Sequence, residues 1–149
     1  MSDHILVGKR NRGFTLIELV VVITILGILA AFAVPRFIGM QSNARAAAIE
    51  SLQGALRSAS ALTHSMWMVT GQPATIPMEG ATITMTNGYP NLTTINNTMV
   101  DLAGFTYDNT TGVFIKIGAT TGSTCSVTYL PPAVLGNPPS ITYDVSNCS

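Results

Sequence analysis

The most constraining feature of this sequence is an apolar run near its N-terminus. Residues 14–34 (FTLIELVVVITILGILAAFAV) are 21 residues with a single charged side chain, Glu18. As an α-helix this run would be roughly 30 Å long, which matches the hydrocarbon core of a bilayer. Lys9, Arg10 and Arg12 precede it, and basic residues on that side favour a cytoplasmic N-terminus. The sequence therefore predicts a helix that spans a membrane.

The composition of the 149-residue chain excludes several classes of protein. Only 9% of the residues are charged, and seven basic side chains balance seven acidic ones. Such a chain lacks the basic face of a nucleic-acid-binding protein, and its 47% hydrophobic content argues against intrinsic disorder. Two cysteines are too few for a disulfide-dense miniprotein or a four-cysteine zinc site. A membrane, secreted or polymerising protein remains.

Glu18 distinguishes the apolar run from an ordinary single-pass anchor. A carboxylate inside a membrane helix costs on the order of 2 to 3 kcal/mol unless it is paired. No Lys, Arg or His lies between Phe14 and Val34, so a cation must come from outside the helix. A secretory signal peptide would have small residues after its apolar core, but here Gly13 precedes the run. If the chain is cut between Gly13 and Phe14, the new α-amino group of a neighbouring copy can pair with Glu18.

The segment GFTLIELVVVITILGILAAFAVPRF (residues 13–37) closely resembles the N-terminus of type IV pilins of the type IVa class. That family has a short basic leader, a Gly, an N-methylated Phe, a Glu four residues later and an apolar helix interrupted by Pro. Here these positions are occupied by Gly13, Phe14, Glu18 and Pro35. The following residues, 41–65, are similar to the mannose-sensitive haemagglutinin pilin group of Gram-negative bacteria. The leader is somewhat longer than the shortest in that group.

The resemblance implies how the N-terminus is processed and used. A prepilin peptidase would cut after Gly13 and methylate Phe14, and the exposed amine would pair with Glu18 of a neighbouring subunit. The precursor would lie in the inner membrane with its head in the periplasm, and pilus assembly machinery would then move it into an extracellular filament. In such filaments the segment that corresponds to Gly27 to Pro35 loses helicity. The alternative is that Pro35 only kinks the helix.

The apolar run is expected to continue as a helix to about Trp67, opposed strongly only by Pro35. Its second half is amphipathic and should pack one face against a globular head. The apolar face is expected to comprise Ile49, Leu52, Leu56, Ala59, Leu62 and Met66. The polar face is expected to comprise Glu50, Gln53, Arg57, Ser60 and His64.

The composition changes after residue 68, where seven of the eight prolines and 16 threonines occur with only five charged residues. Thr82, Thr84 and Thr86 alternate with apolar residues, which is typical of a strand. Four further strands are expected near residues 105–107, 113–117, 126–130 and 141–145. The sequence thus predicts an α+β pilin fold, with a long N-terminal helix packed on a roughly four-stranded antiparallel sheet.

Four regions are expected along the chain. They are a leader (1–13), a transmembrane or filament-core half of the helix (14–40), an amphipathic half (41–68) and a β-rich head (69–149). Cys125 and Cys148 bracket the last loop and strand of the head. In a periplasmic head they should form a disulfide, worth about 3 kcal/mol in the chain-entropy model. Two free buried thiols are the alternative.

No enzymatic function, cofactor, metal site or nucleic-acid binding is expected. The two histidines are His4, in the leader, and His64, which we expect to be solvated or at an interface. Asp101, Asp108 and Asp144 are too far apart in sequence for a calcium loop.

The expected function is that of a structural subunit that polymerises with itself into a type IV pilus. The pilus would serve attachment to host or environmental surfaces and biofilm formation, with motility left open. One alternative is a pseudopilin of a type II secretion system, which shares this N-terminus. Another is a membrane-anchored binding module, which would keep residues 1–13.

Overall fold

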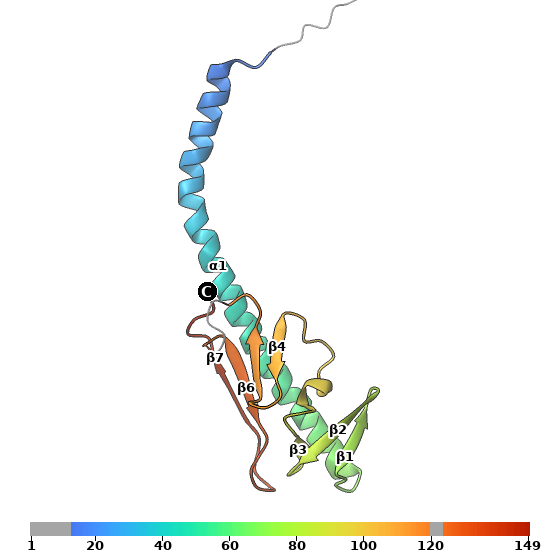
Figure 1. Ribbon diagram of the computed structural model, residues 1–149. Coiled ribbons are helices and arrows are strands. Elements are labelled where there is room, and N and C mark those ends of the chain that lie inside the picture. The colour runs from blue at the N-terminus through green and yellow to red at the C-terminus, as the bar shows by residue number, and fades with distance from the viewer. Residues whose placement is uncertain (1–12, 120–123) are drawn as a thin grey trace, which may run out of the picture. The chain divides into compact units, whose positions relative to one another are not determined.

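The computed structural model describes residues 13–119 and 124–149, without the side chains of residues 35–38. The chain forms two compact units, Met1–Phe37 and Ile38–Ser149, and helix α1 (Leu16–Val69) contributes to both (Figure 1). The long N-terminal helix that the sequence predicts is therefore confirmed. Gly27 and Pro35 both lie within it. Apart from Gly13, the predicted leader lies outside the described residues.

The first unit is a helix with no apolar core of its own. Every residue from 14 to 34 is exposed, because the helix is apolar all round and none of the described residues packs against this part of it. An 18-residue window of α1 near the N-terminus has a mean hydropathy of 2.8 and no buried residue. By length and composition this part of α1 can cross a membrane.

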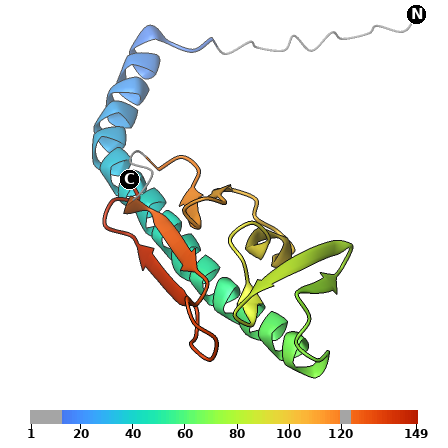
Figure 2. The same ribbon diagram turned by 60° about the horizontal axis from the view of Figure 1, so that its bottom comes forward.

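The second unit carries two antiparallel sheets. The first consists of β1 (Thr75–Met78), β2 (Ala81–Thr86) and β3 (Tyr89–Pro90), and a short 3₁₀ helix, η1 (Ile95–Thr98), follows it. The second consists, in chain order, of β4 (Phe105–Asp108), β5 (Val113–Lys116), β6 (Ser126–Leu130) and β7 (Ser140–Asp144). Both sheets lie along the second half of α1 (Figures 1 and 2). The predicted four-stranded meander and the α+β class are confirmed.

The three-stranded sheet is an addition to the prediction, which contained only the β2 region. β1 includes Pro77, and β3 is two residues long and includes Pro90. Proline lacks the N–H that a sheet ladder uses, so the sequence of these strands argues against them. Both are edge strands of their sheet, which is the position where proline is tolerated.

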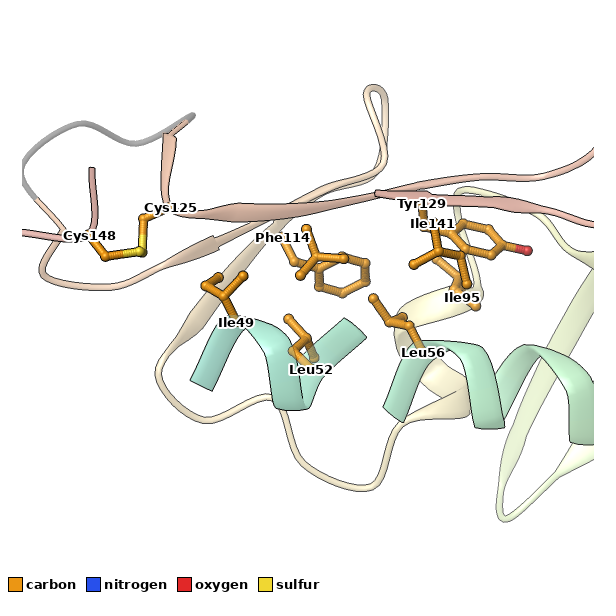
Figure 3. Packing of buried hydrophobic residues seen from close by; sticks show 10 residues of the cluster. Ile49, Leu52, Leu56, Ile95, Phe114, Cys125, Tyr129, Ile141 and Cys148 are labelled. Atoms are coloured by element: carbon orange, nitrogen blue, oxygen red, sulfur yellow. A yellow bond between two sulfur atoms is a disulfide. The ribbon is translucent and has the colours of Figure 1, made fainter. Parts of the chain in front are cut away.

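The core of the second unit lies between α1 and the four-stranded sheet. Ile49 and Leu56 are fully buried and pack in one cluster with Phe114, Val127 and Tyr129 (Figure 3). Burial of such side chains stabilises a fold by about 1.5 to 3 kcal/mol each. This cluster therefore fixes the second half of α1 against the sheet.

The buried face of α1 departs from the predicted one after Leu56. Ser60, Thr63 and Trp67 are buried, whereas Leu62 is 64% exposed and Met66 is 42% exposed. The buried positions from Ile49 onward recur every 3.6 residues on average, as a straight helix requires, while the predicted positions recur every 3.4. The hydroxyls of Ser60 and Thr63 donate to the helix carbonyls of Arg57 and Ala59, so their burial leaves no donor unsatisfied.

The β2–β3 turn fastens the three-stranded sheet to the end of α1. Gly88 has a φ of +85°, and a Cβ there would lie 2.9 Å from the ring of Trp67. The Nδ1 atom of His64 lies 2.7 Å from the carbonyl oxygen of Gly88, and its ring stacks on Tyr89 at 4.3 Å. His64 is thus half-buried in an aromatic cluster, and only glycine fits the adjacent turn.

Cys125 and Cys148 form a disulfide at the C-terminal end of the four-stranded sheet. Both are buried, and Arg45 of α1 donates from Nη1 to the carbonyl oxygen of Cys148 at 3.1 Å. The bridge closes the segment that contains β6 and β7. The last residues of the chain are therefore held to the sheet covalently and to the helix by a hydrogen bond.

Candidate functional site

The first turn of α1 holds Glu18 in a defined position. The backbone N–H and the hydroxyl of Thr15 both donate to Oε2 of Glu18, at 2.9 and 2.7 Å. In return, the N–H of Glu18 donates to the Thr15 hydroxyl at 3.3 Å. These reciprocal bonds form a capping box, in which a Ser or Thr at the helix start pairs with a Glu three residues later. The Thr-x-x-Glu signal of this capping box is present in the sequence but was not among the predicted features.

Glu18 lies on an exposed and otherwise apolar surface. Phe14 is 77% exposed, and with Glu18 it lines a shallow hollow of about 310 Å³ whose other walls are Ile17, Val21 and Val22. Both Thr15 bonds go to Oε2, and within the described residues Oε1 accepts no hydrogen bond. The carboxylate therefore has one oxygen that fixes its orientation and a second that is open to a partner.

This carboxylate has no cationic partner within residues 13–34. Residues 13–34 contain no Lys, Arg or His, so no neighbouring side chain of the helix can neutralise it. In an apolar environment an isolated carboxylate is strongly unfavourable, and a hydrogen-bonded cation at this position would remove that penalty. The arrangement is suited to binding a cationic group rather than to catalysis.

The other predicted residues of this region are also exposed. Gly13 and Phe14 precede the helix, and nothing packs within 4 Å of the position that a Gly13 Cβ would take. The same holds for Gly27, which lies inside α1. Packing within the described chain therefore does not require glycine at either position.

The described residues contain no group of three or more His, Cys, Asp or Glu side chains that could hold a metal ion. Asp101 and Asp108 each serve a local turn instead. Asp101 accepts from the N–H of Ala103, and Asp108 accepts from Thr110.

Comparisons with known proteins place the resemblance at the N-terminus. Residues 8–34 match the family described as the prokaryotic N-terminal methylation motif. The chain is 51% identical over 53 residues to the type IV narrow pilus major component PilA5 of Thermus thermophilus, which is 36% of this chain and 46% of the relative. It is 58% identical over 38 residues to the type IV major pilin protein PilA of Myxococcus xanthus, which is 26% of this chain and 17% of the relative.

A second group of relatives has a different name. The chain is 46% identical over 52 residues to the type II secretion system core protein G of Klebsiella pneumoniae, which is 32% of this chain and 37% of the relative. The chain thus spans less than half the length of the curated relatives it matches. No solved structure matches the chain.

Proposed function

We propose that this chain is a member of the type IV pilin and N-methylation motif family and is the precursor of a structural subunit of a type IV pilus, because its N-terminus matches that motif and two major pilins. In this proposal a prepilin peptidase cuts after Gly13 and methylates Phe14. The subunit is held in the inner membrane by the apolar half of α1, with its head in the periplasm, until assembly machinery adds it to the filament.

The observation that carries the proposal is the oriented carboxylate of Glu18 on an exposed apolar helix. Cleavage after Gly13 creates an α-amino group at Phe14, one helical turn from Glu18. The amine of one subunit can approach Oε1 of Glu18 in a neighbour while Thr15 still holds Oε2. Pairing two charges removes the cost of burying each one alone, so the pair would fix the axial position of each added subunit.

The same geometry supports a continuous filament rather than a closed oligomer. The amine and the carboxylate are different surfaces of one chain, so the contact is head-to-tail, and such contacts generate helical filaments when the rotation does not close. The apolar halves of α1 would then bundle inside and the β-rich heads would face solvent. On assembly the Gly27–Pro35 segment would lose helicity, because both residues oppose helix.

The sequence of residues 41–65 supports a more specific proposal about the class of pilin. We propose that the chain is of the type IVa class and belongs with the mannose-sensitive haemagglutinin pilin group. The filament would then serve attachment to surfaces and biofilm formation.

A second candidate is a pseudopilin of a type II secretion system, because three matching relatives are core protein G of such systems. Electron microscopy of cells at normal expression separates the two candidates. Long surface fibres composed of this chain support the pilin. A secretion defect on deletion, without such fibres, supports the pseudopilin.

Substitutions at Glu18 and Thr15 test the role of the carboxylate. We expect Glu18→Ala to insert into the membrane normally but to lose filaments. It would leave a neighbour's amine unpaired at a cost of about 2 kcal/mol or more, roughly thirtyfold in the assembly equilibrium. Glu18→Gln retains an acceptor for Thr15 without the charge and should fail similarly. The measurement is the yield of sheared filaments relative to membrane-bound subunit.

Thr15→Ala is the matched control for this test. It removes the helix cap, worth about 1 kcal/mol, but keeps the charge of Glu18, so it should retain filaments. Normal filament yield from Glu18→Gln would overturn the charge-pairing role. Equal losses from Thr15→Ala and Glu18→Ala would show that only the cap matters.

Intact-mass measurement of the subunit tests maturation independently. We expect the mass of residues 14–149 plus one methyl group. A mass that still includes residues 1–13 would reject pilin maturation and favour the anchored binding module.

A further inference from the structure

The second unit has an open groove beside the exposed flank of α1. The groove has a volume of about 380 Å³, and Leu62, Met78, Met99 and Val100 form its apolar lining. Val100 is 95% exposed and Leu62 is 64% exposed. We call it the side groove. Leu62 and Val100 are left uncovered in the described chain, and Met78 and Met99 are half-buried. Together they line a concave surface between α1 and the segment after η1.

A convex apolar feature is presented by the loop between β6 and β7. Val134 and Leu135 are 61% and 60% exposed, and we call this pair the loop tip. The N–H of Asn137 donates to the carbonyl oxygen of Val134 at 3.3 Å and closes the turn. At the base of the loop, Asn87 donates to the carbonyl oxygen of Pro132 at 2.8 Å. Four prolines flank the tip, so little conformational entropy would be lost when it binds.

The side groove and the loop tip lie on opposite sides of the helix. Gln53, which donates to the carbonyl oxygen of Ile141 in β7, and Arg57 mark one flank of α1. Leu62, in the groove, follows Arg57 by five residues and is therefore about 140° away around the helix axis. Figure 2 likewise draws the β6–β7 loop and η1 on opposite sides of α1. The loop tip of a chain therefore cannot enter the side groove of the same chain. It can enter the side groove of a second copy.

The charges around the two features are complementary. Asp101 lines the side groove, and Glu79 lines an adjoining hollow that shares Leu62 and Val100 with it. The flank that bears the tip carries the exposed cation of Arg57. Among residues 13–119 and 124–149, no ion pair is formed by any of these three side chains. Each is available to a neighbouring molecule of opposite charge.

We propose that the loop tip of one copy inserts into the side groove of a second copy, with Arg57 of the first facing Glu79 and Asp101 of the second. The contact joins two different surfaces, so it adds copies in one direction and builds an open filament when the rotation between copies does not close a ring. It rests on the proposed filament and names the contact between heads that accompanies the pairing at Glu18.

Cysteine cross-linking between two differently tagged full-length chains tests this contact. One chain carries Val100→Cys and the other carries Leu135→Cys, and both are expressed together and allowed to assemble. The native cysteines are buried in their disulfide and leave the new thiols as the reactive pair. After mild oxidation of sheared filaments, we expect a mixed dimer that carries both tags.

The matched control replaces Val100→Cys by Glu50→Cys. Glu50 is exposed and precedes Arg57 by seven residues, so it lies within about 20° of Arg57, on the flank away from the groove. This pair should give no mixed dimer. Arg57→Glu should also lower filament yield by up to about fivefold, the effect of an exposed ion pair, and Glu79→Lys with Asp101→Lys should restore it.

Each outcome decides between the contact and its failure. A mixed dimer from the Val100→Cys pair alone supports the contact. Intact filaments with no mixed dimer, or with equal dimers from both pairs, overturn the contact and leave the filament proposal standing. A cross-link to a different protein in place of the mixed dimer also overturns it. Absence of filaments from the unsubstituted chain overturns the filament proposal and this contact together.

Discussion

Leu26 and Leu56 are the same residue type in the same helix, about eight turns apart, but their surroundings differ completely. Leu26 is 58% exposed among apolar neighbours that are also exposed, whereas Leu56 is fully buried against the core of the second unit. The first half of α1 thus has an apolar surface that its own unit leaves uncovered. The second half has one buried stripe with polar and small residues around it.

This difference shows which part of the chain is structurally self-sufficient. The second unit has two sheets, a buried cluster and a disulfide, so its fold is determined by contacts within the chain. The first half of α1 is stable only where lipid or other protein surrounds it, because exposed apolar area on this scale marks an interaction surface. Substitutions in the first half of α1 should therefore leave the unfolding stability of the second unit unchanged. Filament yield should depend on residues in both halves.

The sharpest test of the comparison substitutes the two leucines. Leu56→Ala should destabilise the second unit by about 2 to 5 kcal/mol, because it removes buried methyl groups and leaves a cavity. Leu26→Ala should leave the same unfolding transition unchanged. Trp67, the only tryptophan, is buried in the second unit, so its fluorescence during urea unfolding in detergent reports on that unit. A shift of the midpoint by Leu26→Ala would break the division into two halves.

The disulfide should account for a smaller share of the stability of the second unit. Replacing Cys125 and Cys148 by serine should lower the free energy of unfolding by about 3 kcal/mol, the value for a loop of this length. Urea unfolding gives the measurement, and the unsubstituted chain in excess reductant is the control that should unfold at the same midpoint. An unchanged midpoint in both would show that the buried cluster alone holds the C-terminal end.

A hydrogen bond between the two sheets should matter less again. The hydroxyl of the buried Tyr129 in β6 donates to the carbonyl oxygen of Pro90 in β3 at 2.7 Å. Tyr129→Phe keeps the ring but leaves that carbonyl oxygen without this donor, at a cost of about 1 to 3 kcal/mol. Unfolding by urea should show this loss. An unchanged free energy of unfolding would mean that each sheet is held in place by its packing on α1 rather than by this hydrogen bond between the sheets.

The smallest expected effect concerns the acid sensitivity of the second unit. Thr110 and Thr111 donate to Asp108, and these hydrogen bonds lower the pKa of its carboxyl from 3.8 to about 2. Its contribution to stability is therefore complete above pH 4 and is lost as the pH falls from about 4 to about 2. Asp108→Asn should make the melting temperature less dependent on pH in that interval. An unaltered pH profile would contradict this role of Asp108.

The sequence predicted the parts of the fold that rest on local periodicity. Strands β4 to β7 follow from alternating Val, Ile, Thr and Tyr residues between turn signals, and the helix follows from its long apolar pattern. The strands around Pro77 and Pro90 were missed because their sequence opposes strand formation and only tertiary contacts sustain it. Ser60 was assigned to the polar face and the burial of Thr63 was not predicted, because a helix carbonyl can satisfy a buried hydroxyl.

The candidate site likewise has a part that the sequence predicted and a part that it did not. Glu18 is conspicuous in the sequence, because it is the one charge in the apolar run. The cap from Thr15 was overlooked, because hydropathy does not register a hydroxyl that serves the backbone. The side groove was beyond prediction, since it depends on how the segment after η1 lies against α1.

The capping box at Thr15 has a consequence for the transfer of a helix between solvents. In lipid, no water is available to the free N–H groups at a helix start, and each unsatisfied group costs several kcal/mol. The hydroxyl of Thr15 satisfies the N–H of Glu18 from within the chain. In the proposed filament, a subunit that leaves lipid for a dry interior would keep this hydrogen bond. The start of its helix then meets the same polar partner before and after the move.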